Sequence, residues 1–322
     1  MADFSGFGAW AERPHMGWDL MRGIPHLLLL VLLTGCGTSA AVNDSTPISP
    51  AAQRTPAASG TQSSAQSAVA PGKEAPGVSA HCATGAALVV GPYKYDNNQW
   101  GREKAPGPFE QCLLERTVGQ TRELGWTWNW PGTDPSVFAY PEIIFGLKPW
   151  GGGSGDPRFP MKVAEVERLV VHFDVETNAT GSYNLAPELW LINSGEPSGN
   201  PRTITAEIMF WMEHTGSASP AGSIVERPTY DGIEYELWKM ENMGDRGDGK
   251  GWLYYALKSP VTQRKGSIAM HAILAKMAKA GQINPEHYVA GVEFGNEIIG
   301  GTGTTWVKRF DVEARAAERP AE

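Results

Sequence analysis

Two carboxylates lie four residues apart in GVEFGNEIIGGTGTTWV, which covers residues 291–307. Glu293 and Glu297 would share one face of a helix, but they would also share one face of a strand, because strand side chains alternate. Each glycine of this run would cost a helix about 1 kcal/mol. The run is therefore predicted to be a strand that carries both acids on one face and mainly core side chains on the other.

A third carboxylate has similar surroundings in TITAEIMFWM, residues 203–212. Alternation places Glu207 on the same face as Met209 and Trp211, and the opposite face is entirely apolar. A strand with one apolar face packs that face on the core, so the glutamate and the indole are predicted to lie together on the other side of the sheet.

Two further predicted strands repeat this mixture of polar and aromatic side chains. In SYNLAPELWLI, residues 182–192, Glu188 shares a face with Asn184 and Trp190. Sugar rings stack on aromatic faces while their hydroxyls need fixed polar partners, so such faces suit a polysaccharide cleft. A lone strand glutamate is ordinarily solvated and a tryptophan is ordinarily core, but repetition on independent strands favours the cleft. A fourth predicted strand carries three tryptophans on one face, and this face is predicted to lie opposite the core: Trp126, Trp128 and Trp130.

The composition excludes one class of partner. The chain has 322 residues, a formal net charge of −8, 41% hydrophobic residues and 12 tryptophans. Its length allows one large domain or two small ones. A nucleic-acid partner is not expected, because phosphate binding needs a concentrated basic surface and the sequence contains no basic cluster. A neutral ligand that stacks on indole rings fits this composition better.

The apolar run HLLLLVLLTGC, residues 26–36, is too short to span a bilayer but has the proportions of a signal-peptide core. It ends in Leu-Thr-Gly-Cys, which resembles a bacterial lipobox, so Cys36 is expected to be lipidated and to become the mature N-terminus. A signal peptide begins with a positively charged segment, but the residues before Met21 include several acids. Translation is therefore expected to begin at Met21. The protein is predicted to be exported and held at a bacterial membrane by lipid, at the cell surface or in the periplasm.

Three segments follow this leader. Residues 37–80 are mainly Ser, Ala, Thr, Pro, Gly and Gln, and they are predicted to form a disordered linker. The folded domain is expected over residues 81–314, and residues 315–322 form a polar tail. Because lipid uses the first of three cysteines, the other two, Cys82 and Cys112, are predicted to form a disulfide in an oxidising compartment.

The domain is predicted to be all-β. Short β-rich or alternating segments recur between Gly, Pro, Asn and Asp turns, which is typical of a sandwich or barrel. One helix is expected over residues 267–280, with Ser267 as its N-cap and Gly281 as its C-terminal stop. The predicted architecture is two antiparallel sheets with one helix packed outside.

The segment from Cys82 to about Val312 resembles the family 12 glycoside hydrolases. Each motif is weak alone, but all of them occur in the order of the family. They are NNQWG at 97–101, WTWNW at 126–130 with YP at 140–141, YNLAPELW at 183–190, AEIMFW at 206–211 with SPAG at 219–222, and EFGNE at 293–297 with GGTG at 300–303. The resemblance implies a β-jelly-roll sandwich with a concave substrate cleft. It also implies a retaining endo-β-1,4-glucanase acting on cellulose or mixed-linkage β-glucan.

The resemblance also implies roles for four acids. Glu207 corresponds to the nucleophile and Glu297 to the general acid/base, which in retaining enzymes lie about 5–5.5 Å apart. Glu297 must first be protonated, so a raised pKa is expected. Glu188 stands where the family has an aspartate that hydrogen bonds the nucleophile, and it is one methylene longer. Glu293 is expected to position or tune the acid/base.

Five side chains are expected to bind sugar. Trp100 would be a stacking platform and Asn98 would hydrogen bond sugar hydroxyls. The irregular loop over residues 146–160 would cap or extend the cleft. The complete set is Asn98, Trp100, Trp128, Met209 and Trp211.

No cofactor or metal is expected. Asp245 and Asp248 lack the spacing of an EF-hand, the seven histidines show no paired zinc-ligand spacing, and GGGSG at 151–155 lacks the lysine of a phosphate loop. The chain is expected to act as a monomer. Two alternatives remain open: a xyloglucan-specific endoglucanase, and a carbohydrate-binding sandwich without catalysis, which retention of both Glu207 and Glu297 disfavours.

Overall fold

The computed structural model describes residues 77–132, 136–196, 200–244 and 249–317. The predicted signal peptide, the lipobox and the linker up to residue 76 lie outside the described residues, as does the tail from residue 318 onward. Within the described residues, no helix is long and apolar enough to cross a membrane.

Apart from one separate two-stranded hairpin, the described strands form two sheets that share one strand. The first sheet contains β1 (Val78–His81), β4 (Glu110–Val118), β5 (Thr121–Trp130), β18 (Ile298–Ala316), β8 (Val166–Ile192), β10 (Glu213–Thr215) and β16 (Lys265–Ala269). The second sheet has the order β2 (Ala87–Val90), β3 (Tyr93–Asp96), β6 (Glu142–Gly146), β17 (Tyr288–Gly295), β8, β9 (Ile204–Trp211), β15 (Trp252–Lys258), β14 (Glu236–Met243) and β11 (Ser223–Glu226). The short strand β7 (Met161–Lys162) also pairs with β17, and β12 (Thr229–Tyr230) pairs with β13 (Ile233–Glu234).

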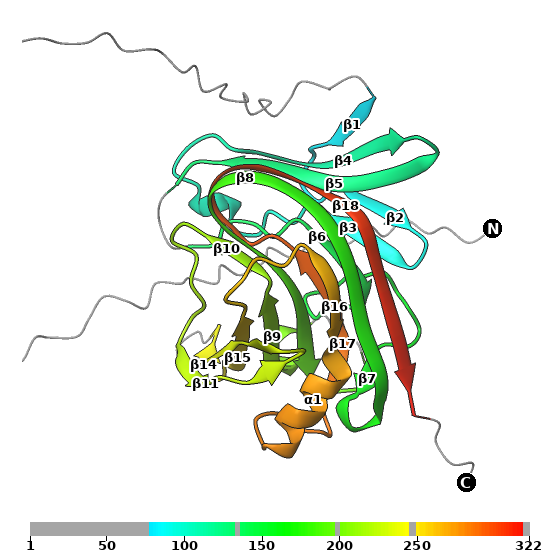
Figure 1. Ribbon diagram of the computed structural model, residues 1–322, viewed down its shortest axis with the longest axis vertical. Coiled ribbons are helices and arrows are strands. Elements are labelled where there is room, and N and C mark those ends of the chain that lie inside the picture. The colour runs from blue at the N-terminus through cyan, green and yellow to red at the C-terminus, as the bar shows by residue number, and fades with distance from the viewer. Residues whose placement is uncertain (1–76, 133–135, 197–199, 245–248, 318–322) are drawn as a thin grey trace, which may run out of the picture. The chain divides into compact units, whose positions relative to one another are not determined.

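Strand β8 connects the two sheets because it is long and bends. Its first part pairs with β18 as far as Tyr183, and its last part, from Ala186, pairs with β17 and β9. Figure 1 shows β8 and β18 as long curved arrows that run side by side. The predicted all-β sandwich is confirmed. The prediction of purely antiparallel sheets is wrong at one place, because β15 runs parallel to β9.

The main hydrophobic core lies between the sheets. Phe173 of β8 in the first sheet packs against Phe294 of β17 in the second, with 5.7 Å between ring centroids. All three tryptophans of β5 belong to this core and are at most 1% exposed. Alternation on β5 was therefore predicted correctly, but its aromatic face was assigned to the wrong side. Trp128 packs edge-on against Tyr183 and is 0% exposed, so it cannot bind sugar.

The helix is shorter at its start than predicted. Helix α1 covers Met270–Lys279, and its N-cap is Ala269, which makes no side-chain cap. Ser267 is instead part of β16, whose backbone pairs with β8, and its hydroxyl contacts His172 Nδ1 at 2.6 Å. Sheet pairing outweighs capping here. The predicted stop is confirmed, since Gly281 follows the helix with φ +70°. Three short 3-10 helices cover Arg102–Lys104, Val163–Glu165 and Pro201–Thr203.

The ends of the fold lie slightly outside the predicted limits. Strand β1 begins at Val78, three residues before the expected start of the domain, and pairs with β4. Strand β18 continues to Ala316, beyond the expected end at residue 314. Just after β1, Cys82 forms the predicted disulfide with Cys112 of β4. The disulfide therefore fastens the first described strand to its sheet.

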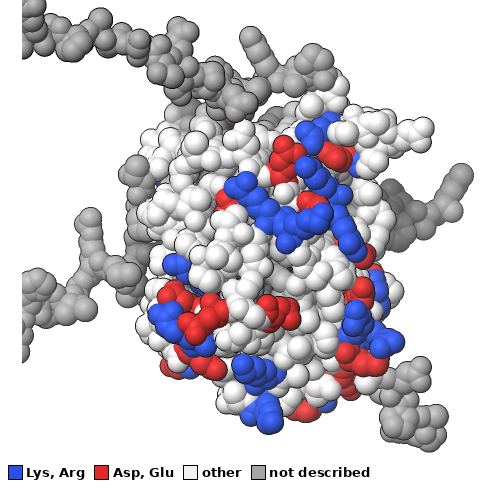
Figure 2. Space-filling view, in the orientation of Figure 1, with Lys and Arg blue, Asp and Glu red and all other residues white. Residues whose placement is uncertain are grey.

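Charged side chains lie in neighbouring pairs on the outer surface of β4, β5, β8 and β18. Arg116 lies 2.6 Å from Glu123, and Lys308 lies 3.0 Å from Glu176. Figure 2 shows basic and acidic side chains next to one another on this face. Exposed pairs of this kind contribute roughly 0–1 kcal/mol each. Here they place the basic groups beside acidic ones rather than in a separate basic surface.

Replacing both Cys82 and Cys112 with serine is expected to lower the free energy of unfolding by about 3–4 kcal/mol. The reason is that the disulfide closes a loop across a sequence separation of 30, which restricts the unfolded chain. Urea denaturation followed by tryptophan fluorescence measures the change, and reduction of the unsubstituted protein is the matched control. An unchanged urea midpoint in the double variant would contradict this account.

Candidate active site

The predicted acids of the second sheet lie on the face turned away from the main core. Cross-strand register pairs Glu293 of β17 with Glu188 of β8, and Glu188 with Met209 of β9. Glu207 is two residues before Met209, so alternation places it on this face too. We call this surface the site face, defined by Glu142, Glu188, Glu207 and Glu293. A second apolar cluster, which includes Trp190, Met209, Trp211, Trp252 and Tyr254, packs on the same face.

Glu207 is held by the neighbouring parallel strand. Strand β9, which carries Glu207, pairs with β15. Tyr254 of β15 is the register partner of Glu207, and Trp252 lies two residues before Tyr254. The Trp252 indole Nε1 donates a hydrogen bond of 2.9 Å to Glu207 Oε2. Burial and the negative charge of Glu297 raise the pKa of Glu207 to about 8, although the Trp252 hydrogen bond lowers it.

Glu297 lies in a break between strands rather than on a continuous strand. β17 ends at Gly295 and β18 begins at Ile298, so the predicted unbroken strand is wrong at the two residues between them. The buried amide of Asn296 fixes this break. Its Oδ1 accepts hydrogen bonds from Trp126 Nε1 at 2.8 Å and from Thr305 Oγ1 at 2.9 Å.

Asn184 orients the carboxyl group of Glu297. The Asn184 Nδ2 donates to Glu297 Oε2, and the Glu297 backbone N–H donates to Asn184 Oδ1 at 3.1 Å. Burial raises the pKa of Glu297 to about 7, and the hydrogen bond from Asn184 opposes this rise. The expected rise in pKa is therefore present, and burial is its main cause.

Glu207 and Glu297 belong to one electrostatic site, because the charge of Glu297 acts on Glu207. Interacting carboxyl groups lose their protons in two steps that belong to the pair rather than to either residue. With pKa values of about 7 and about 8, the pair carries roughly one proton between these pH values. The site can therefore offer a carboxylic acid and a carboxylate at the same time.

Glu188 lies beside other acids, and the charge of the predicted nucleophile Glu207 also acts on it. Its Oε1 accepts the indole N–H of Trp190 at 3.1 Å, whereas the hydrogen bond described for Glu207 comes from Trp252. Carboxyl oxygens of Glu142, Glu188 and Glu293 all lie within 4.8 Å of one another. The extra methylene of Glu188 is consistent with this position. The described contacts include no hydrogen bond between Glu188 and Glu207, and the aspartate-like support that the family resemblance implied for Glu188 stays a prediction.

A lysine provides the positive charge in this group of three acids. Lys148 Nζ lies 3.0 Å from Glu293 Oε2 and also contacts Glu142 Oε1. Its side chain is 12% exposed, so the ammonium is largely removed from water. A cluster of three carboxyl groups is the type of set that can hold a divalent cation, but here the ammonium of Lys148 contacts two of the three.

The loop at residues 146–160 contributes a tryptophan as well as this lysine. Trp150 packs edge-on against Trp190 at 5.5 Å and against Trp252 at 5.7 Å between ring centroids. Trp190 and Trp252 also contact each other at 5.7 Å. Through Trp252, this group of three indoles supports the hydrogen bond to Glu207. The loop thus reaches the site face, and the sequence interpretation did not identify its residues individually.

The predicted sugar-binding residues occupy different environments. Trp100 is 37% exposed, so its ring is available for stacking, and Asn98 Nδ2 donates to Glu142 Oε1 at 2.8 Å. Met209 and Trp211 are buried beside Glu207, and the Trp211 indole donates to Met209 Sδ at 3.4 Å. Their position fits the floor of a site rather than an exposed platform.

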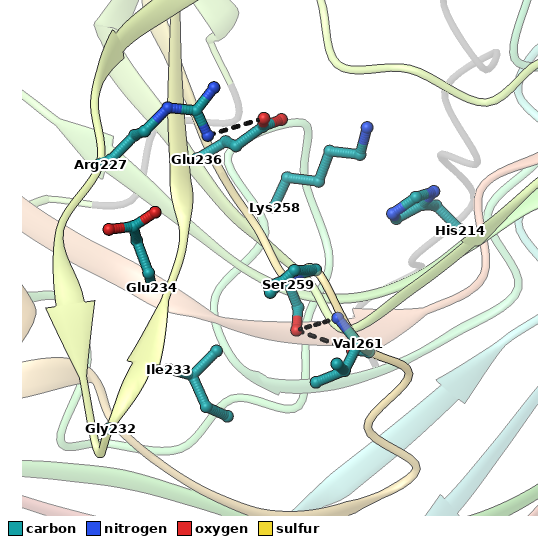
Figure 3. Close-up of a pocket in the computed structure, with 10 residues that line it drawn as sticks. His214, Arg227, Gly232, Ile233, Glu234, Glu236, Lys258, Ser259 and Val261 are labelled. Atoms are coloured by element: carbon teal, nitrogen blue, oxygen red, sulfur yellow. Dashed lines mark hydrogen bonds and ion pairs between the residues drawn. The ribbon is translucent and has the colours of Figure 1, made fainter.

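A separate pocket of about 510 Å³ lies beyond the C-terminal end of β9. In Figure 3, Arg227 pairs with Glu236 on one side, and Lys258 and His214 occupy the other. Lys258 of this pocket is the register partner of Trp211. Trp211 is four residues beyond Glu207 on β9, a distance of roughly 13 Å along a strand. The pocket is therefore distinct from the paired acids.

Comparisons with known proteins agree with this fold. The model of glycosyl hydrolase family 12 matches residues 91–315. Endoglucanase S of Pectobacterium parmentieri is 25% identical over 231 residues, covering 71% of this chain and 84% of that protein. Among solved structures, a family 12 xyloglucanase from Bacillus licheniformis is 28% identical with a TM-score of 0.64, covering 74% of this chain and 100% of that one. Endoglucanase cel12A from Rhodothermus marinus is 25% identical with a TM-score of 0.60, covering 74% and 99%.

The chain belongs to glycosyl hydrolase family 12. It is accordingly an enzyme with the jelly-roll sandwich of that family, as its sequence motifs predicted.

Replacing Trp252 with phenylalanine removes the indole N–H that donates to Glu207. Because this hydrogen bond favours the ionised carboxylate, its loss is expected to raise the pKa of Glu207. The acid limb of kcat/KM should move up by about 1 pH unit, the equivalent of a hydrogen bond to a charged group. The matched control is Trp238→Phe, since that indole donates to Glu236 at 3.2 Å instead. Equal movement of the limb in both variants would refute the role of Trp252.

Proposed function

We propose that the protein is a retaining endo-β-1,4-glucanase that hydrolyses internal linkages of cellulose or mixed-linkage β-glucan. The observation that carries this proposal is the pairing of Glu207 and Glu297 in one buried site with room for roughly one proton between them. Retaining glycosidases need one carboxylate to attack and one carboxylic acid to protonate the leaving oxygen.

In the first step, the Glu207 carboxylate attacks the anomeric carbon and forms a glycosyl ester. The bond from that carbon to the bridging oxygen breaks, and Glu297 gives its proton to this oxygen. In the second step, Glu297 takes a proton from water as the water oxygen attacks the anomeric carbon. Glu207 leaves as a carboxylate, and the configuration at the anomeric carbon is retained after two inversions.

The surrounding hydrogen bonds suit these roles. Trp252 donates to Glu207 and stabilises the carboxylate that must attack and later depart. Asn184 donates to one oxygen of Glu297 and so fixes its orientation while the group changes protonation state. The first step requires the proton of the pair to be on Glu297, because Glu297 acts as the general acid.

The similar proteins support the substrate class. One is an endoglucanase of Pectobacterium parmentieri, and another is a xyloglucanase of Bacillus licheniformis. We infer that Trp100 stacks on a backbone glucosyl unit and that Asn98 bonds a hydroxyl, because the first is exposed and the second lies beside the acids. A preference for xyloglucan is the second candidate, favoured by the 28% identity to the xyloglucanase.

Initial rates on carboxymethylcellulose, barley β-glucan and tamarind xyloglucan test the substrate assignment. The proposal expects the first two to be cleaved faster than the third, with a rapid fall in viscosity as internal bonds break. A faster rate on xyloglucan would replace the first candidate with the second. Release of glucose alone, with no fall in viscosity, would contradict internal cleavage.

The two catalytic assignments predict different kinetic losses. Glu207→Gln should reduce hydrolysis by at least about 10⁴-fold on every substrate, because no other group takes over the attack. Glu297→Ala should slow polysaccharide cleavage by about 10²–10⁴-fold, the usual contribution of a general acid. In the same variant, the first step on aryl glycosides should be much less affected, because a good leaving group departs without protonation. The control is Glu234→Gln at the separate pocket. Equal losses on both substrate types in Glu297→Ala would argue against its acid role.

We further propose that the enzyme is exported as a lipoprotein, with Met21 as its start and Cys36 as its lipidated residue. The support is the apolar run that ends in Leu-Thr-Gly-Cys and the linker-like composition after it. Because all described acids of the site come from one chain, we propose that it acts as a monomer.

Metabolic labelling with a fatty acid tests the lipid anchor. The unsubstituted protein expressed with its own leader in a bacterial host should incorporate label and sediment with membranes. Cys36→Ser should lose the label and appear in the soluble fraction, whereas Cys82→Ser should keep it. Label that persists in Cys36→Ser would remove this proposal without affecting the catalytic one.

A further inference from the structure

Four buried groups beside Glu207 form a closed network that the double displacement itself does not require. We propose that Lys148 and Glu142 are positioning residues, which act with Glu293 and Glu188 as a charge-neutral unit that keeps the proposed nucleophile ionisable. The proposal rests on the function proposed above. Neither Lys148 nor Glu142 takes part in the bond-making steps.

The contacts show that the network is closed. Lys148 Nζ contacts Glu142 Oε1 and lies 3.0 Å from Glu293 Oε2, and the two carboxyl side chains are 0% and 1% exposed. Oxygens of Glu142, Glu188 and Glu293 lie within 4.8 Å of one another. The three acids come from the adjacent strands β6, β17 and β8, and the lysine comes from the loop after β6.

A count of charges shows why the network must hold protons. Three ionised carboxylates and one ammonium would leave an excess of two negative charges in a buried place. Burial of unpaired charge costs several kcal/mol per ion, so protonation is the less costly state. Among the described residues, Glu142 Oε2 and Glu293 Oε1 have no other hydrogen-bond partner. A proton shared between the two carboxyl groups satisfies these oxygens.

The charge distribution follows from these contacts. Burial opposes ionisation of Glu293, but Lys148 and hydrogen bonds from Glu142 and Glu188 lower its pKa below the ordinary value. Burial and then the charge of Glu293 raise the pKa of both Glu142 and Glu188 well above that value. Ionised Glu293 is therefore balanced by ionised Lys148, while the other two acids are protonated and donate to Glu293.

The groups facing the network from each packed element are few. On β3, Lys94 is paired with Asp96 at 2.9 Å and adds no net charge. Tyr140, just before β6, donates its hydroxyl to Ala186 O at 2.7 Å. The remaining titratable neighbours belong to the site itself, namely Glu207 on β9, Tyr254 on β15 and Glu297 just before β18.

The network acts on catalysis through charge. The negative charge of Glu293 raises the pKa of Glu207, and the positive charge of Lys148 balances it. Loss of the ammonium alone would keep Glu207 protonated at higher pH. Loss of the Glu293 charge alone would have the opposite effect. If Lys148 and Glu293 had only a structural role, their loss would not shift the pKa of Glu207 in opposite directions.

A set of charge-changing variants in the full-length protein tests the proposal through the acid limb of kcat/KM. Lys148→Met should move the limb up by about 1 pH unit, and Glu293→Gln should move it down by a similar amount. The double variant Lys148→Met/Glu293→Gln should return toward the unsubstituted value, because the net charge is restored. The control is Lys162→Met, which removes a surface lysine paired with Glu286 at 2.6 Å.

Shifts of the same sign in the two single variants, or no return in the double variant, would overturn the proposal. If Lys148→Met does not fold, Lys148→Arg keeps the charge and should leave the limb in place, and Glu293→Gln still tests the sign. The proposal would also be overturned if Lys148→Arg moved the acid limb of kcat/KM as far as a variant that removes the charge.

A second measurement does not depend on activity. At neutral pH, the infrared band of protonated carboxyl groups should be present in the substrate-free protein and should weaken in Glu142→Gln and in Glu188→Gln. Absence of any change in both variants would overturn the network even if the protein hydrolyses glucan. Presence of these changes in a protein without glucanase activity would leave the network in place and remove the proposed function instead.

Discussion

The burial of several carboxyl groups on one face of a sheet is the constraint on which the site depends. Four glutamates that are at most 8% exposed project from adjacent strands: Glu142, Glu188, Glu207 and Glu293. Such a face cannot hold four negative charges, because the cost of desolvation would exceed the stability of an ordinary domain. Protons, one lysine and indole N–H groups make the arrangement possible.

The same constraint links the fold to the chemistry. The bend of β8 lets a single strand supply Asn184 to Glu297 and, farther along, Glu188 to the acid network. The parallel pairing of β15 with β9 brings Trp252 to Glu207. A break at Asn296 turns Glu297 out of the strand that precedes it. Each acid therefore has a distinct set of donors, and this difference allows distinct roles.

Sequence reasoning located the elements whose alternation is local, and it failed where distant contacts decide. The period of β9 correctly gave the face of Glu207, and the family motifs gave the fold. On β5 the alternation was correct, but only the packing of the two sheets shows that Trp128 faces inward. Lys148 has no local signal, since its partner Glu293 is 145 residues away, although a lysine in a tryptophan-containing loop predicted to cap or extend the cleft was a usable hint.

The central claim is that Glu207 forms the covalent bond to sugar, and trapping that bond tests it most directly. A 2-deoxy-2-fluoro cellobioside with a good leaving group slows the second step and lets the glycosyl-enzyme accumulate. Peptide mapping by mass spectrometry then locates the label. The account predicts one label per chain, on Glu207. A label on Glu188, Glu293 or Glu297 would contradict it, and so would turnover of β-1,4-glucan without any label on the protein.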